Sequence, residues 1–253
     1  MCTVVILRRP GHRWPVLIAA NRDEMLDRPW SPPARHWPDR PDVVAGRDEL
    51  AGGTWLGIND EGVVAAVMNR PGSLGPADDK RSRGELVLEA LDHAEARAAG
   101  DALSHIDPQA YRPFNLVVAD AGDAIWLRSD PDTGADRVEA FFLPEGLSML
   151  TSHDRNDLHS DRIRTYLPRF EAAAEPDPDS DDWTGWDRLV ASRDMGEIGG
   201  APSAMNIVTE FGFGTVSCSL IALPALDAAD AGPIWRFAPG RPDEVPFAPV
   251  RLK

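Results

Sequence analysis

Lysine and cysteine are both scarce in this 253-residue chain, and each scarcity excludes a class of protein. Only Lys80 and Lys253 are lysines, so arginine supplies nearly all of the 26 positive charges. The two cysteines, Cys2 and Cys218, are too few for a disulfide scaffold and do not form a metal-binding CxxC pair. We therefore expect free thiols and no metal site.

Long hydrophobic runs are also missing. No apolar run approaches the roughly 20 residues that a transmembrane helix needs. The amino terminus lacks a secretory pattern, because its apolar run begins at residue 3, is very short and is followed rather than preceded by arginines. We therefore expect a cytoplasmic protein without a membrane span. With 43% hydrophobic residues, the chain can bury a sizeable core, which we expect to form one domain over residues 1–253.

The net charge is −15, which argues against a nucleic-acid partner, since binding to phosphate requires clustered cations. Acid-rich stretches such as residues 177–182 add to an aspartate-heavy surface. The partner that we expect is a small-molecule substrate or ligand.

Self-repulsion on such an acidic surface is best tolerated where salt screens it. We therefore predict a halophilic surface, adapted to a high-salt cytoplasm. The unfolding temperature should rise steeply between dilute and molar salt, which thermal denaturation at both concentrations measures. A flat response would contradict this interpretation.

Two apolar, β-branched runs, residues 3–7 and 16–20, predict a β-hairpin with a Pro-Gly turn between them. Antiparallel pairing around this turn places Cys2 near Asn21. A thiol at the chain start would then lie beside the dense polar tetrad of residues 21–24.

Further along, strand-like runs alternate with a few helical segments. Together they predict an α+β architecture of antiparallel sheets with covering helices. The proline-rich stretch 28–41 predicts an ordered extended loop. Helices are expected over residues 82–99, where Gly100 would end the helix, and over residues 159–174 and 183–193.

The position of Cys2 suggests nucleophilic chemistry. Methionine aminopeptidases usually remove Met1 when residue 2 is small, and Cys2 would then carry both a thiol and a free α-amine. An α-amine has an unperturbed pKa of about 7.7–8, so it can take the thiol proton without a histidine. Arg22 would favour the thiolate, and Asp23 could hold that arginine or the amine in place.

Acyl transfer also needs donors directed at the developing oxyanion, and Asn69 is the first candidate. Four further residues are candidates for substrate binding: Asn21, Trp55, Arg83 and Asn115. Each candidate has a structural alternative. Cys2 could be a buried small hydrophobe behind a retained Met1, and the tetrad a turn with solvated charges. Trp55 could pack in the core, Arg83 could belong to a helix start, and Asn115 could be a structural hydrogen-bonding residue.

Several short motifs occur in order along the chain. They are Met1-Cys2, Asn21-Arg22-Asp23-Glu24, Arg28-Pro29, Gly52-Gly53-Thr54-Trp55-Leu56-Gly57, Asn69, Arg83-Gly84-Glu85-Leu86-Val87 and Phe114-Asn115-Leu116. Each is weak alone, but their joint occurrence resembles the NRDE family, also called the TANGO2 (transport and Golgi organisation) family.

The resemblance implies the fold of N-terminal nucleophile (Ntn) hydrolases, an αββα sandwich of two antiparallel sheets covered by helices. It extends loosely to the choloylglycine-hydrolase and penicillin V acylase group. By that resemblance Cys2 is the nucleophile, Arg22 and Asp23 are counterparts of an arginine and an aspartate after the first hairpin, and Asn69 serves the oxyanion.

The sequence departs from the family pattern at two places that bear on activity. The family often has an arginine before the serines of a late strand, where this chain has Val216, and the acylases use a downstream arginine without an obvious match here. Two functions follow from the resemblance. The first is a cysteine Ntn hydrolase of a non-peptide or small cyclic amide, without a cofactor. The second is a non-catalytic carrier of haem or another small ligand, since eukaryotic members are associated with haem trafficking.

Overall fold

The computed structural model describes residues 2–130, 136–197, 199–228 and 231–252. Its contacts divide the chain into two compact units, each built on one antiparallel sheet. Unit 1 comprises Met1–Arg28 and Pro144–Val250, and unit 2 comprises Pro29–Leu143 with Arg251–Lys253. The expectation of one domain stays a prediction.

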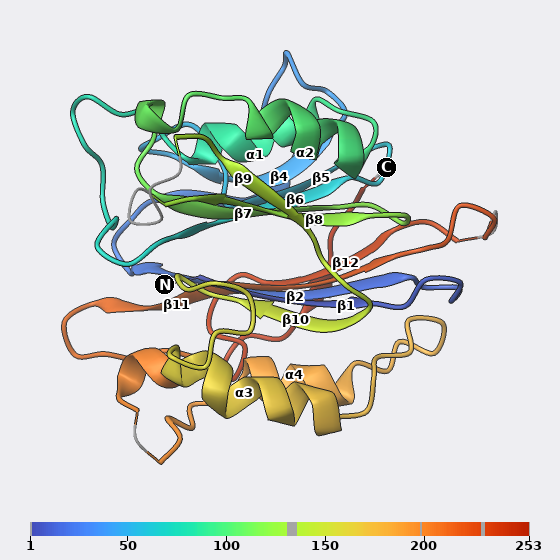
Figure 1. The fold of residues 1–253 in the computed structure, drawn as a ribbon. Coiled ribbons are helices and arrows are strands. Elements are labelled where there is room, and N and C mark those ends of the chain that lie inside the picture. Colours follow the sequence, from blue (N-terminus) through green and yellow to red (C-terminus); the bar gives the residue numbers. More distant parts are fainter. Residues whose placement is uncertain (1, 131–135, 198, 229–230, 253) are drawn as a thin grey trace. The chain divides into compact units, whose positions relative to one another are not determined.

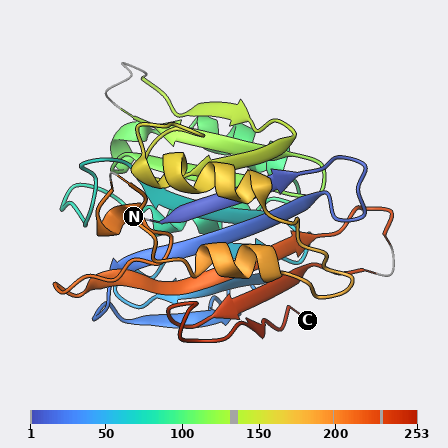
Figure 2. The same cartoon turned by 90° about the horizontal axis from the view of Figure 1, so that it is seen from below.

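Unit 1 is a six-stranded sheet in the order β10-β1-β2-β11-β12-β13, and the helices α3 and α4 lie across one of its faces (Figures 1 and 2). We call this the helix face of unit 1. Apolar residues of both helices and of the central strands form a core there, including Leu17, Met149, Tyr166 and Trp186. The elements are β1 Thr3–Arg8, β2 Val16–Met25, β10 Gly146–Leu150, α3 Asp161–Ala172, α4 Thr184–Val190, η3 Ala201–Ser203, β11 Phe213–Leu223, β12 Ile234–Ala238 and β13 Ala248–Pro249.

Unit 2 is a seven-stranded sheet in which β3 to β9 follow one another in chain order. The helices α1 and α2 lie on one face of it and share a core with residues such as Phe114, Leu116 and Ile125 (Figure 1). The elements are β3 Trp30–Ala34, β4 Val43–Asp48, β5 Leu56–Asn59, β6 Val64–Asn69, α1 Gly84–Leu91, α2 Ala96–Ser104, η1 Pro108–Ala110, β7 Phe114–Ala119, β8 Ala124–Ser129 and β9 Glu139–Phe142.

The long helix expected over residues 82–99 is wrong, because α1 and α2 are two separate helices. The side-chain Nδ2 of Asn59 donates to the carbonyl oxygens of Leu91 and His93, at 2.9 and 2.7 Å. These hydrogen bonds hold the end of α1. Gly100 lies inside α2 instead of ending a helix. A Cβ atom there would lie 2.6 Å from Ile125 Cδ1, so glycine lets the helix approach the sheet closely.

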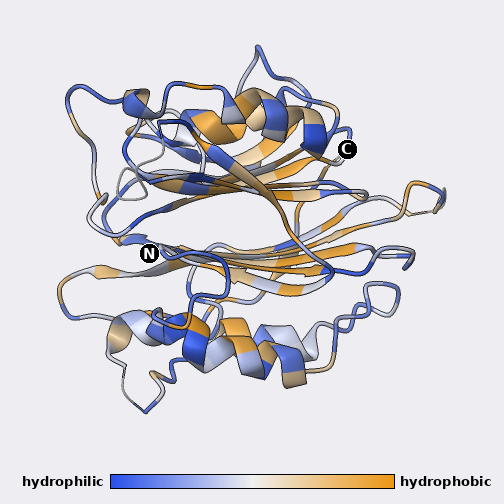
Figure 3. Cartoon of the chain, in the orientation of Figure 1, coloured by the Kyte–Doolittle hydropathy of each residue, from blue (hydrophilic) through white to orange (hydrophobic). Residues whose placement is uncertain are grey.

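The proline-rich stretch 28–41 contains an edge strand, β3, in addition to loop. An edge position tolerates Pro32 and Pro33, since a proline there has no neighbour to donate a hydrogen bond to. Hydrophobic residues concentrate in the strands and helices, and hydrophilic ones in the connecting loops (Figure 3). No helix among the described residues is both long and apolar enough to cross a membrane.

Candidate active site

Cys2 immediately precedes β1, which lies between β10 and β2 in the sheet of unit 1. β1 pairs with β2 so that Thr3 lies opposite Asn21, and the predicted hairpin is confirmed. The register differs by one residue from the expected one: continued past Thr3, it places Cys2 beside Arg22 rather than Asn21. The pairing of β1 with β10, continued in the same way, places the buried Ser152 on the other side of the thiol.

The polar tetrad lies inside β2 rather than in a turn after it. Side chains along a strand alternate between its two faces. Leu17 belongs to the core on the helix face, so Asn21 and Asp23 point to the same face and Arg22 points away from it. By the same alternation along β1, Cys2 shares the face of Arg22. The thiol and the guanidinium are therefore neighbours on the face opposite α3 and α4.

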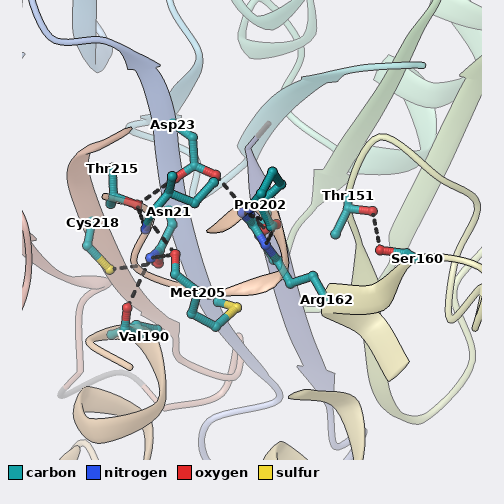
Figure 4. Close-up of polar contacts among 12 residues, drawn as sticks. Asn21, Asp23, Thr151, Ser160, Arg162, Val190, Pro202, Met205, Thr215 and Cys218 are labelled. Atoms are coloured by element: carbon teal, nitrogen blue, oxygen red, sulfur yellow. Dashed lines mark hydrogen bonds and ion pairs between the residues drawn. The ribbon is translucent and has the colours of Figure 1, made fainter. Parts of the chain in front are cut away.

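Asp23 is the centre of a buried polar network on the helix face (Figure 4). Its Oδ2 accepts a hydrogen bond from Arg162 Nη1 at 2.8 Å, and its Oδ1 accepts one from Thr215 Oγ1 at 2.7 Å. The same guanidinium donates to Thr3 Oγ1 at 2.5 Å and to the carbonyl oxygen of Pro202 at 2.9 Å. The carboxylate thus connects β2 to α3 and β11, on the face of the sheet opposite the thiol.

Asn21 is engaged by protein partners on the same face (Figure 4). Its Nδ2 donates to the carbonyl oxygens of Met205 and Val190, at 2.9 and 3.1 Å, and its Oδ1 accepts a hydrogen bond from Cys218 Sγ at 3.2 Å. Val190 ends α4, and Met205 lies in the loop after η3. The Asn21 side chain therefore ties the end of that helix and this loop to β2, and its expected contact with a substrate stays a prediction.

The environment of Cys2 sets its protonation. Burial raises the pKa of the Cys2 thiol above its ordinary value, although the positive charge at the amino terminus opposes this. The Asp23 carboxylate adds to the rise, whereas a hydrogen bond from the Asp23 backbone and the Arg22 charge lower the pKa. Burial dominates, so the thiol is protonated at neutral pH and needs a base. Burial also raises the pKa of Cys218 well above its ordinary value, as expected of a structural thiol.

Of the eight expected site residues, four lie in unit 1 and four in unit 2. Asn69, in unit 2, ends β6. Val67, two residues earlier, packs against the core under α1 and α2, so alternation directs Asn69 to that face. Arg83 Nη1 donates to the carbonyl oxygens of Ser73 and Pro113, at 2.8 and 3.1 Å, and so joins the loop after β6 to the start of β7. The roles expected for both residues stay predictions.

Asn115 and Trp55 also have partners within unit 2. Asn115 Oδ1 accepts hydrogen bonds from Arg70 Nη1 at 2.8 Å and from Trp126 Nε1 at 3.1 Å. The Trp55 ring packs edge-on against Trp30, with 5.7 Å between the ring centroids. These contacts agree with the structural alternatives for both residues, and substrate contact stays a prediction for each.

Sequence reasoning missed Arg162, the charged partner of Asp23. The helix that carries it was expected correctly, apart from two residues at each end. Arg162 precedes the buried Tyr166 by one helical turn and so lies on the same buried stripe, which was the available signal. Thr215 gave no such signal, because a β-bulge between Thr215 and Ser217 sets the face on which it lies.

A small cavity of about 210 Å³ adjoins this network in unit 1. Arg162 and Pro202 form part of its wall, together with Thr151, His153 and His159. The polar side chains in its wall can hold a small polar group beside the Asp23 network. Within the described part of the chain, no three His, Cys, Asp or Glu side chains are grouped so that they could hold a metal ion.

A sequence profile of the family described as Transport and Golgi organisation 2 matches residues 1–175, more than half of the chain. The chain belongs to this family. The expectation drawn from the tetrad and its companion motifs is thereby confirmed.

Relatives from mammals show how far this likeness reaches. The Transport and Golgi organization protein 2 homolog of Homo sapiens is 37% identical over 134 residues, which cover 46% of this chain and 45% of the relative. The Transport and Golgi organization 2 homolog of Mus musculus is 36% identical over 115 residues, 42% of this chain and 38% of the relative. The match spans less than half the length of these relatives.

Solved structures resemble the chain over almost its whole length. The Caenorhabditis elegans ortholog of N-acylethanolamine-hydrolyzing acid amidase has a TM-score of 0.59 at 14% identity, covering 90% of this chain and 96% of that one. A mutant conjugated bile acid hydrolase from Clostridium perfringens has a TM-score of 0.55 at 12% identity, covering 99% and 97%. Such low identities show the fold alone. The predicted class is confirmed: α+β and Ntn-hydrolase-like, with two antiparallel sheets covered by helices.

Proposed function

We propose that this chain is a cysteine amidohydrolase of the N-terminal nucleophile type, acting on a non-peptide or small cyclic amide. The observation that carries the proposal is the place of Cys2, which the strand pairing puts beside Arg22 on one face of the sheet. Asp23 is in turn held by Arg162 and Thr215. The likeness to an amidase and a bile acid hydrolase in fold supports the reaction class.

The reaction would begin once removal of Met1 has exposed the α-amine of Cys2. The neutral amine takes the thiol proton while sulfur attacks the amide carbon. The C–N bond then breaks, the leaving nitrogen receives that proton, and the acyl group remains as a thioester. Water attacks the thioester, its proton passes through the amine to sulfur, and the carboxylic acid leaves. Arg22 stabilises the developing thiolate, and Asn69 is the donor that the resemblance suggests for the oxyanion.

The proposal predicts that removal of Met1 activates Cys2. With Met1 retained, the raised pKa keeps the Cys2 thiol protonated, so iodoacetamide should react with it more slowly at about pH 7.5 than with a model thiol without an α-amine. The rate should rise by about tenfold per pH unit as the pH rises. After methionine aminopeptidase treatment, Cys2 should react faster than the model thiol. Intact mass reports both processing and labelling.

Two variants make this test specific. Cys218→Ser should label like the wild type, because Cys218 is buried, and Cys2→Ala should not label. If native-host protein retains Met1, or if Cys2 of the processed protein reacts no faster than a model thiol without an α-amine, the amine is not the base and the proposal fails.

The alternative is a non-catalytic carrier of haem or another small ligand on the same fold. The protonated thiol favours it while Met1 is retained, since a thiol of raised pKa is a poor nucleophile. The same protonated thiol does not fit thiolate ligation of haem iron. A haem carrier should therefore show the same haem-dependent absorbance shift in the wild type and in Cys2→Ala. A processed protein that turns over an amide would contradict the carrier.

A further inference from the structure

Unit 2 contains a cavity of about 470 Å³ that none of the expected catalytic residues lines. Its walls come from the loop after β6, from η1 and the start of β7, and from the end of β8. Three cations line it: Lys80, Arg112 and Arg137. One of the chain's two lysines is therefore here, in a protein whose net charge is −15.

The guanidinium of Arg112 is fixed by neutral partners. Its Nη1 donates to the carbonyl oxygen of Leu74 at 2.6 Å, and its Nη2 donates to that of Gly72 at 2.8 Å. Longer bonds reach Gly75 and Pro76. Carbonyl oxygens hold the guanidinium in place without cancelling its charge. Among the described residues, no carboxylate forms an ion pair with Arg112.

The other charges at the cavity also leave a positive excess. Lys80 Nζ donates to the carbonyl oxygen of Gln109 at 2.7 Å, and its ion pair is with the exposed Asp79 at 3.5 Å. Arg137 is exposed, and no described carboxylate forms an ion pair with it. Among the described residues, one carboxylate lines the cavity, that of Asp130, and it already forms an ion pair of 2.5 Å with Arg70.

Elsewhere in unit 2, arginines meet carboxylates. Arg81 lies 2.7 Å from both Glu85 and Glu89, and Arg40 lies 2.8 Å from Asp92. These pairs neutralise the acidic surface locally. The cavity is different, because its cations are held by backbone oxygens or are exposed. Their field converges on a concave pocket, where solvent screens it less than on a flat surface.

From this arrangement we infer that the cavity is a binding site for a small organic anion, a carboxylate or a phosphate monoester with an apolar body. The cations receive the anionic group, and the apolar body lies against Tyr111, Pro108 and Pro113. The volume is in the range of small-molecule sites, about 300–1,000 Å³. A polyanion is a poor occupant, because the acidic surface around the cavity repels it. This site is independent of the proposed hydrolase chemistry.

Calorimetric titration with phenyl phosphate, phenylacetate and the neutral benzyl alcohol tests the inference. We expect at least one anion to bind saturably and about tenfold more tightly than the alcohol, since charge-assisted hydrogen bonds form with the anion only. The anion that binds more tightly shows whether the site prefers a phosphate ester or a carboxylate. If neither anion binds more tightly than benzyl alcohol, the inference is overturned.

Charge-removing variants locate the site. Arg137→Gln and Lys80→Gln should each weaken binding of the preferred anion by about tenfold. Arg97→Gln removes the same charge from an exposed arginine of α2 that pairs with Asp123, outside the cavity, and should leave the dissociation constant unchanged. An equal loss in Arg97→Gln would mean that only the general surface charge is sensed, which also overturns the inference. Unchanged melting curves would confirm that all three variants fold.

Discussion

Replacing Arg162 with methionine should lower the free energy of unfolding by about 3–5 kcal/mol, the usual cost of removing one partner from a buried ion pair. The Arg162 and Asp23 side chains are 3% and 0% exposed, so water cannot replace the lost partner. The variant also deprives Thr3 and Pro202 of a donor. Chemical denaturation with linear extrapolation measures the change.

The same helix offers a matched control. Arg164 forms an ion pair with Asp161 at 2.5 Å, but these side chains are 42% and 46% exposed. Arg164→Met should therefore cost less than about 1 kcal/mol. Adding Asp23→Leu to Arg162→Met removes the stranded carboxylate and should recover part of the loss. If Arg162→Met costs no more than Arg164→Met, the network does not hold Asp23 in place.

Cys2→Ala should reduce amide hydrolysis by a factor on the order of 10³ or more, because no other group replaces a catalytic nucleophile. The substrate is found first, by comparing cell extract incubated with processed wild-type protein and with Cys2→Ala in a mass-resolved screen. A species consumed by the wild type alone, with the corresponding acid formed, gives the substrate for steady-state measurements.

The second cysteine provides the control for this experiment. Cys218→Ser keeps a small polar atom near Asn21 Oδ1, on the face of the sheet that does not carry Cys2. It should retain most of the wild-type rate. Equal turnover by Cys2→Ala and wild type would exclude Cys2 as the nucleophile, and an equal loss in both variants would indicate damage to the fold.

Local patterns predicted the elements that depend on neighbours in sequence. The hairpin of β1 and β2 follows from two apolar runs around a turn, and α3 follows from apolar residues at helical spacing. The break between α1 and α2 was missed, because it depends on Asn59, a residue of β5 that receives no weight in a helical pattern.

The candidate site was only partly predicted, because it too depends on residues that are distant in sequence. The structural alternative for Asn21 to Glu24 was a turn with solvated charges, because four polar residues in a buried strand are unfavourable without partners. Those partners are distant in sequence: Arg162 is 139 residues from Asp23, and Thr215 is 192 residues from it. Composition and periodicity contain no information about such pairings. The family motifs indicated that the tetrad matters, without indicating what holds it.

The distance in sequence between Asp23 and its partners has a consequence during synthesis. Ribosomes add about 5–20 residues per second, so Thr215 follows Asp23 by on the order of 10–40 s. During this interval the strands around Cys2 lack β11, which adjoins β2 in the finished sheet. The network around Asp23 cannot close until Thr215 has been made. The proposed removal of Met1 during synthesis would therefore precede closure of the network, and slowing translation should then increase the processed fraction.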